Sequence, residues 1–264
     1  MKNTLKAALD RIQQVSENEV TGTSTGFKGI DSVTHGLHSG ELTIVGFRRC
    51  LSASAFLLNS ALNISKKSSV FYISCKDSKD IIGSSILSIG SGLNQKNIRN
   101  AAILDDDWPL IVATVKHLSK NPNLKIEYCP KLTTSSLESM IRDSLPLELV
   151  IIDNLQQLEI TTDTQLADFL KGLKKLALEL DIPILVSTSI SFEQEKSKSY
   201  TFSDDPRLEA YTDTSLLFSN NLFNEKSTVE GDIEITVTNR ANYIEQKLYY
   251  SFDINGFTIR ERKY

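Results

Sequence analysis

Between residues 42 and 188, short apolar runs alternate with longer segments whose apolar residues recur at helical spacing. The apolar runs predict buried strands at residues 42–47, 70–75, 124–128, 149–153 and 182–188. The segments between them predict helices at residues 53–64, 79–90, 107–119, 134–144 and 164–180. Because strands that alternate with helices form βαβ units, we expect an α/β fold with a mostly parallel central sheet and helices on both faces. A chain of 264 residues with 40% apolar residues can bury one sizeable core, so a second full domain is not expected.

The two ends of the chain differ from this central part. Residues 4–16 carry Leu5, Leu9 and Ile12 on one helical stripe, which predicts an amphipathic helix that needs a partner surface. At the other end, period-two alternation at residues 233–238 and within 246–252 and 257–260 predicts antiparallel strands. We therefore expect a linker helix within residues 1–18, followed by one domain over residues 19–264.

Charge and cysteine usage narrow the function classes. The net charge is -4 and the sequence pI is near 5.5, which argues against tight autonomous DNA binding but leaves a weak loop contact open. Cys50, Cys75 and Cys129 form no CxxC pair, so we expect buried or incidental thiols in a reducing cytosol. No apolar run approaches the ~18 residues of a membrane span, and no signal peptide is evident. We expect a cytoplasmic protein without membrane contact.

Five stretches of the chain resemble the motor domain of DnaB-type replicative helicases. Residues 19–45 resemble the family's "TG(I/V)xTGFxxLDxxTxGLxxGDLxIV", and residues 149–156 resemble its Walker B strand "LIVIDYLQ". The other similar stretches are residues 107–118 ("DEDWxxLxxAxxxL"), 132–142 ("LTxxEIRxxAR") and 173–187 ("LKxLAKELNVPVIALS"). The resemblance covers nearly the whole chain and implies a RecA-like P-loop NTPase fold with a role in DNA replication.

The same resemblance implies a partner. In that family the linker helix packs on the adjacent subunit of a hexamer, so Leu5, Leu9 and Ile12 would contact a second copy of this chain or a DnaB-type helicase. We expect a linker plus motor domain only, without the family's primase-binding N-terminal domain.

The P-loop is the first place where the chain departs from the family. A P-loop binds phosphates with glycine N–H groups and a lysine, while a hydroxyl reaches Mg²⁺. The family's "(A/G)RPSMGKT" aligns with residues 47–54, where Ser52 replaces the required glycine and Ala53 replaces the lysine. Only Ser54 keeps a hydroxyl at the position suited to Mg²⁺. The small first residue is Phe47, which we expect to obstruct the turn. A lost charge-assisted hydrogen bond of about 1.5–3 kcal/mol would weaken nucleotide about tenfold to a hundredfold.

An alternative for phosphate binding stays open. Arg48 or Arg49 could fold back and replace the lysine, since an arginine binds phosphate well.

The catalytic glutamate is also replaced. The family's "SLEMS" aligns with residues 74–78, which places Lys76 in the acid's position. A cation cannot accept the proton of an attacking water. Asp77 points to the opposite face of an extended chain, so its use would need a local kink. We therefore expect no catalytic residue.

Some positions of the family's ATP site remain recognisable. Asp153 keeps the Walker B position and would hold Mg²⁺ with Ser54, although an aspartate that ends a strand can also cap a turn. Thr188 replaces the γ-phosphate-sensing glutamine of "ALSQ". Arg240 keeps the arginine of "KQRNG", which in the family reaches the neighbouring subunit's ATP site. We expect no bound cofactor, with weak Mg-ATP binding left open.

The family's DNA-contacting loop corresponds to a long polar segment at residues 191–206. Its charges nearly cancel, which is poor for a phosphate-driven site. The charged residues are Glu193, Glu195, Lys196, Lys198, Asp204 and Asp205. The family's "RESGxIEQDAD" is barely recognisable around residues 207–214.

Three functions follow from these observations. The first is a non-catalytic, degenerate DnaB-like motor domain that acts through subunit contacts with itself or with an active helicase. The alternative is a divergent ATP-dependent helicase that uses Arg48 or Arg49 with Asp77. The second alternative is an ATP-independent DNA-binding or loader-like module.

Overall fold

The computed structural model describes residues 5–6, 9, 12–13, 20–47, 53–158, 162–189, 208, 210–219, 230–240, 244–253 and 255–261. Nine strands form one sheet in the order β3-β2-β4-β5-β1-β6-β7-β8-β9. Their bounds are β1 Leu42–Phe47, β2 Val70–Ser74, β3 Leu124–Tyr128, β4 Leu149–Asp153, β5 Ile184–Ser189, β6 Thr214–Ser219, β7 Glu230–Asn239, β8 Ile244–Asp253 and β9 Thr258–Glu261. The strands from β3 to β6 are parallel, and β7, β8 and β9 join them antiparallel.

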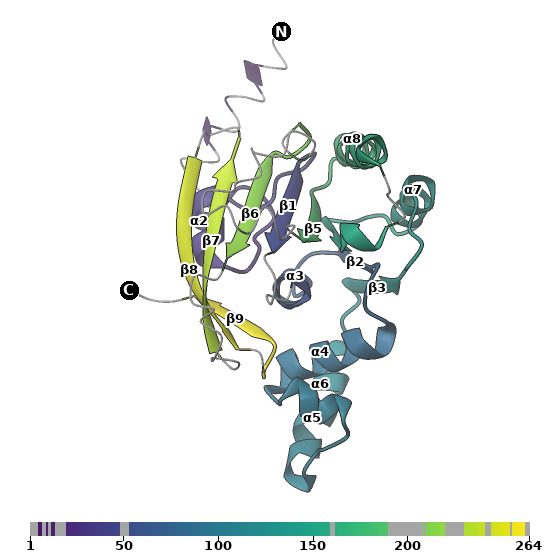
Figure 1. Ribbon diagram of the computed structural model, residues 1–264, viewed down its shortest axis with the longest axis vertical. Coiled ribbons are helices and arrows are strands. Elements are labelled where there is room, and N and C mark those ends of the chain that lie inside the picture. Colours follow the sequence, from purple (N-terminus) through teal and green to yellow (C-terminus); the bar gives the residue numbers. More distant parts are fainter. Residues whose placement is uncertain are drawn as a thin grey trace.

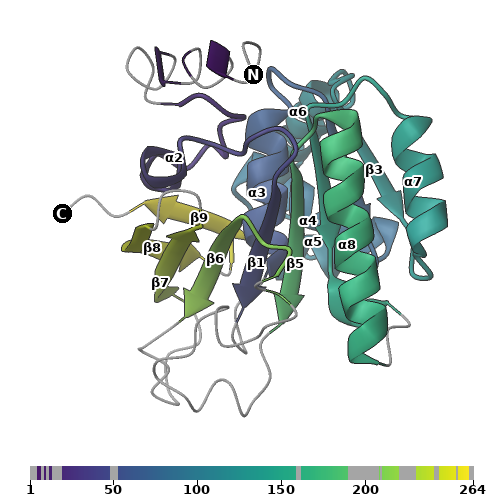
Figure 2. The ribbon, with the colours of Figure 1, turned by 90° about the horizontal axis from the view of Figure 1, so that it is seen from above.

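Helices cover both faces of this sheet (Figure 1, Figure 2). They are α2 Lys28–Thr34, α3 Ala53–Ile64, α4 Lys79–Ser91, α5 Gln95–Arg99, α6 Trp108–Leu118, α7 Thr134–Arg142 and α8 Asp163–Leu180, with 3-10 turns at Asp105–Asp107 and Leu155–Gln157. One buried apolar cluster joins α2, α3 and α4 to the sheet. A second joins α7 and α8 to the opposite face. The α4, α5 and α6 helices project together from the body of the molecule (Figure 1).

The predicted α/β fold is confirmed. All five expected central strands and all five helices between them are present within about two residues of their predicted bounds, and the C-terminal strands are antiparallel as expected. Strand β5 begins after Pro183, which has no N–H to contribute to the sheet. A sixth parallel strand, β6, lies on the other side of β1. It was not predicted because its buried run Thr214–Ser219 is short and half polar.

Aromatic side chains fill the junction between the parallel and antiparallel strands. Phe47, the last residue of β1, is buried and stacks on Phe218 with ring centroids 4.5 Å apart. Phe218 also packs on Phe56 of α3, at 4.8 Å. The ring of Phe47 is therefore part of the core. Residues 48–52 of the turn lie outside the described residues, so its obstruction stays a prediction.

A buried carboxylate fixes the segment that leads into the domain. Asp31 of α2 is only 4% exposed. Its carboxylate accepts hydrogen bonds from Ser24 Oγ at 2.6 Å and from both the backbone N–H and the Oγ1 of Thr25 at 2.8 Å. These contacts hold residues 24–27 against α2, so that Phe27 can stack on Phe56 with centroids 5.0 Å apart.

Replacing this carboxylate should loosen that segment. Asp31→Ala leaves a buried N–H and a buried hydroxyl without an acceptor, so we expect it to lower the free energy of unfolding by about 2–3 kcal/mol. That loss corresponds to a melting temperature about 5–10 °C lower. Calorimetry of Asp31→Ala beside Asp105→Ala, an exposed aspartate, tests the expectation. Equal melting temperatures for the two variants would contradict it.

Candidate nucleotide-binding site

The candidate site lies where neighbouring parallel strands end. Asp153 is the last residue of β4, Thr188 is near the end of β5, and Asp77 follows β2. Ala53 and Ser54 begin α3, the helix that follows β1. In open α/β sheets ligands bind at the carboxyl ends of the strands, so the fold brings these residues to the expected end of the sheet.

Asp153 is the centre of the site. Its carboxylate is 1% exposed and accepts three hydroxyl hydrogen bonds. Ser54 Oγ donates to Oδ2 at 2.6 Å, Tyr72 OH donates to Oδ2 at 2.8 Å, and Ser187 Oγ donates to Oδ1 at 2.9 Å. Burial raises the pKa of Asp153 above its usual value, against the opposing effect of the three hydrogen bonds. The predicted pairing of Ser54 with Asp153 is therefore present.

Tyr72 and Ser187 belong to this arrangement, although the sequence reading treated both as ordinary strand residues. Tyr72 is fully buried, and burial together with the Asp153 charge holds its pKa well above its usual value. A buried tyrosine hydroxyl generally needs a hydrogen-bond partner. A tyrosine within an otherwise apolar strand was the signal that could have predicted this contact.

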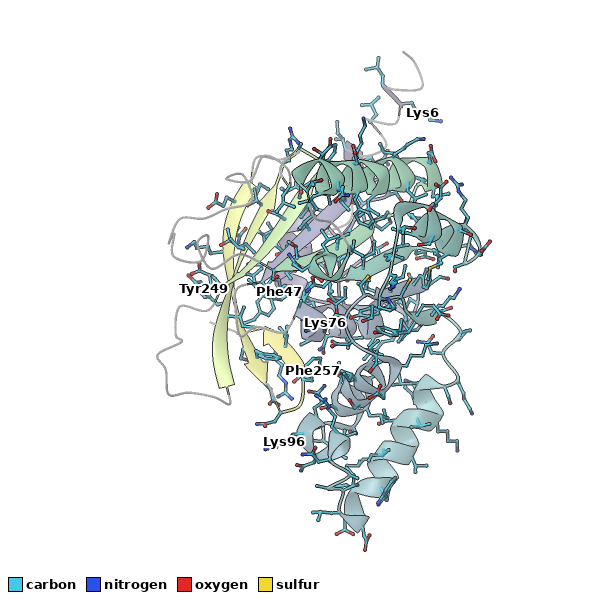
Figure 3. The ribbon with its side chains drawn as sticks, turned by 45° about the vertical axis from the view of Figure 1, so that its right-hand side comes forward. Lys6, Phe47, Lys76, Lys96, Tyr249 and Phe257 are labelled. Atoms are coloured by element: carbon cyan, nitrogen blue, oxygen red, sulfur yellow. The ribbon has the colours of Figure 1, made fainter. Side chains whose placement is uncertain are left out.

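Asp77 contacts Ser54 of the site. Its neighbour Lys76, labelled in Figure 3, is exposed. Residues 75–77 bend away from β2, and Ser74 stabilises the bend. The Ser74 hydroxyl donates to the Asp77 carbonyl and accepts from the Asp77 N–H, both at 2.9 Å. The bend brings the Asp77 carboxylate to Ser54 Oγ, which donates to it at 3.3 Å. The local kink that the use of Asp77 would require is therefore present.

Hydroxyl and carboxylate oxygens meet in the described part of the site. Ser54, Asp77 and Asp153 offer the hydroxyl and carboxylate oxygens that Mg²⁺ prefers. Ala53, which the sequence predicts to replace the family's lysine, is half-buried at the start of α3 and offers only a methyl group. Arg48, Arg49 and Ser52 lie outside the described residues.

Two other predicted residues, Thr188 and Arg240, are described with partners other than Asp153. Thr188 Oγ1 accepts a hydrogen bond from Gln156 Nε2, which ties β5 to the turn that follows β4. Arg240 is exposed in the turn after β7, where its N–H donates to the Asp213 carbonyl at 2.9 Å. Since β7 is antiparallel to β6 and ends beside the start of β6, Arg240 lies at the amino ends of the parallel strands. It therefore lies at the end of the sheet opposite Ser54. The acidic and basic residues of the loop at 191–206 lie outside the described residues, as does Arg207.

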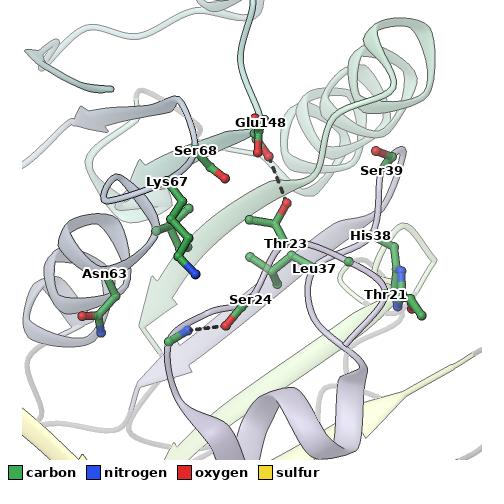
Figure 4. A pocket seen from close by; sticks show the side chains of 13 residues that line it. Thr21, Thr23, Ser24, Leu37, His38, Ser39, Asn63, Lys67, Ser68 and Glu148 are labelled. Atoms are coloured by element: carbon green, nitrogen blue, oxygen red, sulfur yellow. Dashed lines mark hydrogen bonds between the residues drawn. The ribbon is translucent and has the colours of Figure 1, made fainter. Parts of the chain in front are cut away.

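A cavity of about 660 Å³ also lies at the amino ends of the strands (Figure 4). The segment 21–26, the end of α3 and Glu148 line it, with Lys67 and His38 among its polar groups. None of the residues around Asp153 lines it, so this cavity is separate from the candidate site.

Two groups of large apolar side chains are exposed. Leu5, Leu9 and Ile12 are each more than half exposed. Trp108, Val112 and Val115 lie at i, i+4 and i+7 on α6, and each is about half exposed. Among the described residues, no helix has the length and apolar character that crossing a bilayer requires.

The mostly parallel sheet with its antiparallel edge is the RecA-like P-loop NTPase fold. Two solved structures share this fold. The ATPase domain of G40P matches with a TM-score of 0.89 at 20% identity, covering 99% of this chain and 98% of that one. A DnaB-like replicative helicase, solved in a study of its interactions with primase, matches with a TM-score of 0.88 at 19% identity, covering 100% of this chain and 67% of that one.

The chain belongs to the family of DnaB-like helicase C-terminal domains, whose model matches residues 22–240. The replicative DNA helicase DnaB of Buchnera aphidicola subsp. Baizongia pistaciae is 28% identical over 253 residues, covering 89% of this chain and 55% of the relative. That of Geobacillus stearothermophilus is 25% identical, covering 100% of this chain and 63% of the relative. The chain thus spans little more than half the length of these curated relatives.

Proposed function

We propose that this DnaB-like domain does not hydrolyse ATP itself and acts through contacts with neighbouring subunits of the same fold. The observation that carries the proposal is Ala53 at the first residue of α3, beside a Ser54–Asp153 pair that is otherwise intact. A lysine there would supply the positive charge for phosphate, and a methyl group supplies none. Lys76, exposed at the end of β2, adds a second defect, because it cannot accept a proton from water.

The exposed apolar residues support a role in subunit contacts. Leu5, Leu9 and Ile12 lie within the linker helix proposed for residues 1–18, and their exposure leaves an apolar stripe for a partner to cover. The partner is a second copy of this chain or an active DnaB-type helicase. In a mixed ring, Arg240 would act on the neighbour's ATP, since it lies at the end of the sheet opposite its own Ser54.

One observation favours the alternative of a divergent, active ATPase. The bend after β2 brings Asp77 next to Ser54. A carboxylate is therefore available close to the position where Lys76 replaces the family's glutamate. This alternative needs Arg48 or Arg49 to replace the lysine. The third function, an ATP-independent DNA-binding or loader-like module, is weakened by the net charge of -4.

The proposal is tested by co-purification with the DnaB-type helicase encoded in the same genome. We expect a complex that Leu9→Asp abolishes and that Lys6→Asp, at an exposed position of the same segment, leaves intact. Ultracentrifugation of the chain alone separates self-association from a mixed assembly. If neither a complex nor an oligomer forms, the subunit-contact proposal is wrong.

Arg240 provides a separate prediction for the mixed ring. We expect Arg240→Ala to lower the ATPase rate of the mixed assembly by about tenfold or more, because an arginine supplied in trans stabilises the transition-state charge. Arg260→Ala, which removes another exposed arginine, should leave the rate unchanged. Equal rates for both variants would rule out the trans role while leaving the subunit contact itself standing.

A further inference from the structure

Two cysteines that are far apart in the sequence meet at the end of the sheet. Cys75 follows β2 and Cys129 follows β3, and these strands are parallel neighbours. The register pairs Ser74 with Tyr128, so the next pair in the same register is Cys75 with Cys129. The Cys129 N–H donates to the Ser74 carbonyl at 2.8 Å, which continues the ladder to this point. The two cysteines are therefore cross-strand neighbours.

Their side chains lie on the same face of the sheet. Cys75 is buried in the apolar cluster beneath α7 and α8, and Cys129 packs against the same cluster. Neighbouring strands lie about 4.8 Å apart, which is within the Cα separation of about 4.4–6.8 Å that disulfides span. Neither thiol is bonded in this structure.

The two cysteines differ in their exposure to solvent. Cys129 is half-buried and is therefore the more accessible residue of the pair. Cys75 is 3% exposed, so its thiol is shielded from solvent. An accessible thiol beside a shielded one is the arrangement in which the first is oxidised and the second resolves it.

We propose that Cys75 and Cys129 form a reversible redox modification site, in which a peroxide oxidises Cys129 and Cys75 closes a disulfide. The Cys129 thiolate attacks one peroxide oxygen, the O–O bond breaks, and Cys129 sulfenic acid and hydroxide form. The Cys75 sulfur then attacks the Cys129 sulfur, so that the S–S bond forms and the S–O bond breaks. The departing hydroxide takes the Cys75 proton and leaves as water. The two thiols lose two electrons, and the peroxide is reduced to water.

Cys75 lies close in the chain, and Cys129 in the sheet, to a residue of the candidate site, Asp77. Cys75 immediately precedes Lys76 and lies two residues before Asp77, in the bend that aims Asp77 at Ser54. A covalent link to β3 would fix this bend at its start. In a reducing compartment such a bond would be transient, which is typical of redox-sensing disulfides. The inference does not depend on whether the chain hydrolyses ATP.

Peptide mapping of the folded, full-length chain tests the proposal. The chain is treated with hydrogen peroxide, alkylated, digested with trypsin without reduction and analysed by mass spectrometry. Trypsin releases Cys75 in residues 68–76, Cys129 in residues 126–131 and Cys50 in residues 50–66, so each thiol has its own peptide. We expect the 68–76 and 126–131 peptides to disappear together. A linked species, lighter than their sum by two hydrogens, should replace them and be lost on reduction.

Three variants separate this site from unspecific oxidation. Cys50→Ala should leave the link unchanged, because Cys50 follows β1, which β4 and β5 separate from β2 in the sheet. Cys129→Ala should abolish the link. Cys75→Ala should leave Cys129 as a sulfenic acid that dimedone traps, an outcome that a merely destabilised chain would not give selectively. Links that involve Cys50, or no link while Cys129 is oxidised in the wild type, would overturn the proposal.

Discussion

Titration of the purified chain with a fluorescent, slowly hydrolysed ATP analogue and Mg²⁺ should show no saturable binding up to roughly millimolar nucleotide. The reason is the missing charge at the start of α3, where Ala53 precedes Ser54. The oxygen ligands of Ser54 and Asp153 are in place, so the expected defect lies in phosphate binding rather than in metal binding.

Restoring the charge should restore affinity. Ala53→Lys places an ammonium next to Ser54, and we expect it to tighten binding about tenfold to a hundredfold, the equivalent of one charge-assisted hydrogen bond. Ala53→Met, similar in length but uncharged, is the matched control. Micromolar binding by the wild type that Asp153→Ala abolishes would instead show that Arg48 or Arg49 has rebuilt the loop. The active-enzyme alternative would then take first place.

Removal of the Asp153 side chain should have the largest effect on stability. Asp153→Ala leaves the buried hydroxyls of Tyr72 and Ser187 without their acceptor, and leaves Ser54 only its longer contact with Asp77 at 3.3 Å. Each orphaned group costs about 1–3 kcal/mol, and the loss of a buried charge offsets part of that cost. We expect the free energy of unfolding to fall by about 2–4 kcal/mol, measured by urea denaturation. Tyr72→Phe removes a single donor and should lower it by about 1 kcal/mol. A loss no larger than that of Asp106→Ala, at an exposed position, would refute the structural role of Asp153.

The pH dependence of stability provides a signature of the same carboxylate. Burial raises the pKa of Asp153 in the folded state, so the folded chain holds this proton more tightly than the unfolded chain does. The contribution of Asp153 to stability therefore falls as pH rises from the unfolded pKa, about 3.9, through the raised folded pKa. Relative to Asp153→Asn, the wild type should gain stability as pH is lowered through this window. A relative loss would show that the folded pKa is depressed.

Most of the fold could be predicted from the sequence, because the spacing of apolar residues within each segment distinguishes strands from helices. The long apolar runs of β1, β2 and β4 leave little ambiguity, and the resemblance brought Ser54 and Asp153 together correctly. Strand β6 was missed because Thr214–Ser219 carries polar residues that only its position within the sheet buries. Alternation of side chains along an extended strand could not predict the direction of Asp77 either, because the chain bends after Ser74 and the Ser74 side chain stabilises this bend.

Contacts between segments that are far apart in the chain could not be predicted from the sequence either. The adjacency of Cys75 and Cys129 depends on the register between β2 and β3, and the helices that connect these strands set that register. No spacing between two cysteines 54 positions apart (129 − 75) encodes it. The same holds for Ser187, which meets Asp153 only because β5 lies beside β4.

Three buried hydroxyls donate hydrogen bonds to Asp153, and this arrangement affects how such a site changes over evolutionary time. Ala53 is half-buried and Lys76 is exposed, so substitution at either position leaves the interior intact. Asp153 has less freedom, because its buried carboxylate accepts hydrogen bonds from three hydroxyls. Mutational drift should therefore erase the phosphate-binding and water-activating positions first, and the Walker B aspartate last. Retention of that aspartate in a divergent relative is accordingly a record of ancestry and packing, and by itself it says little about whether the protein still hydrolyses nucleotide.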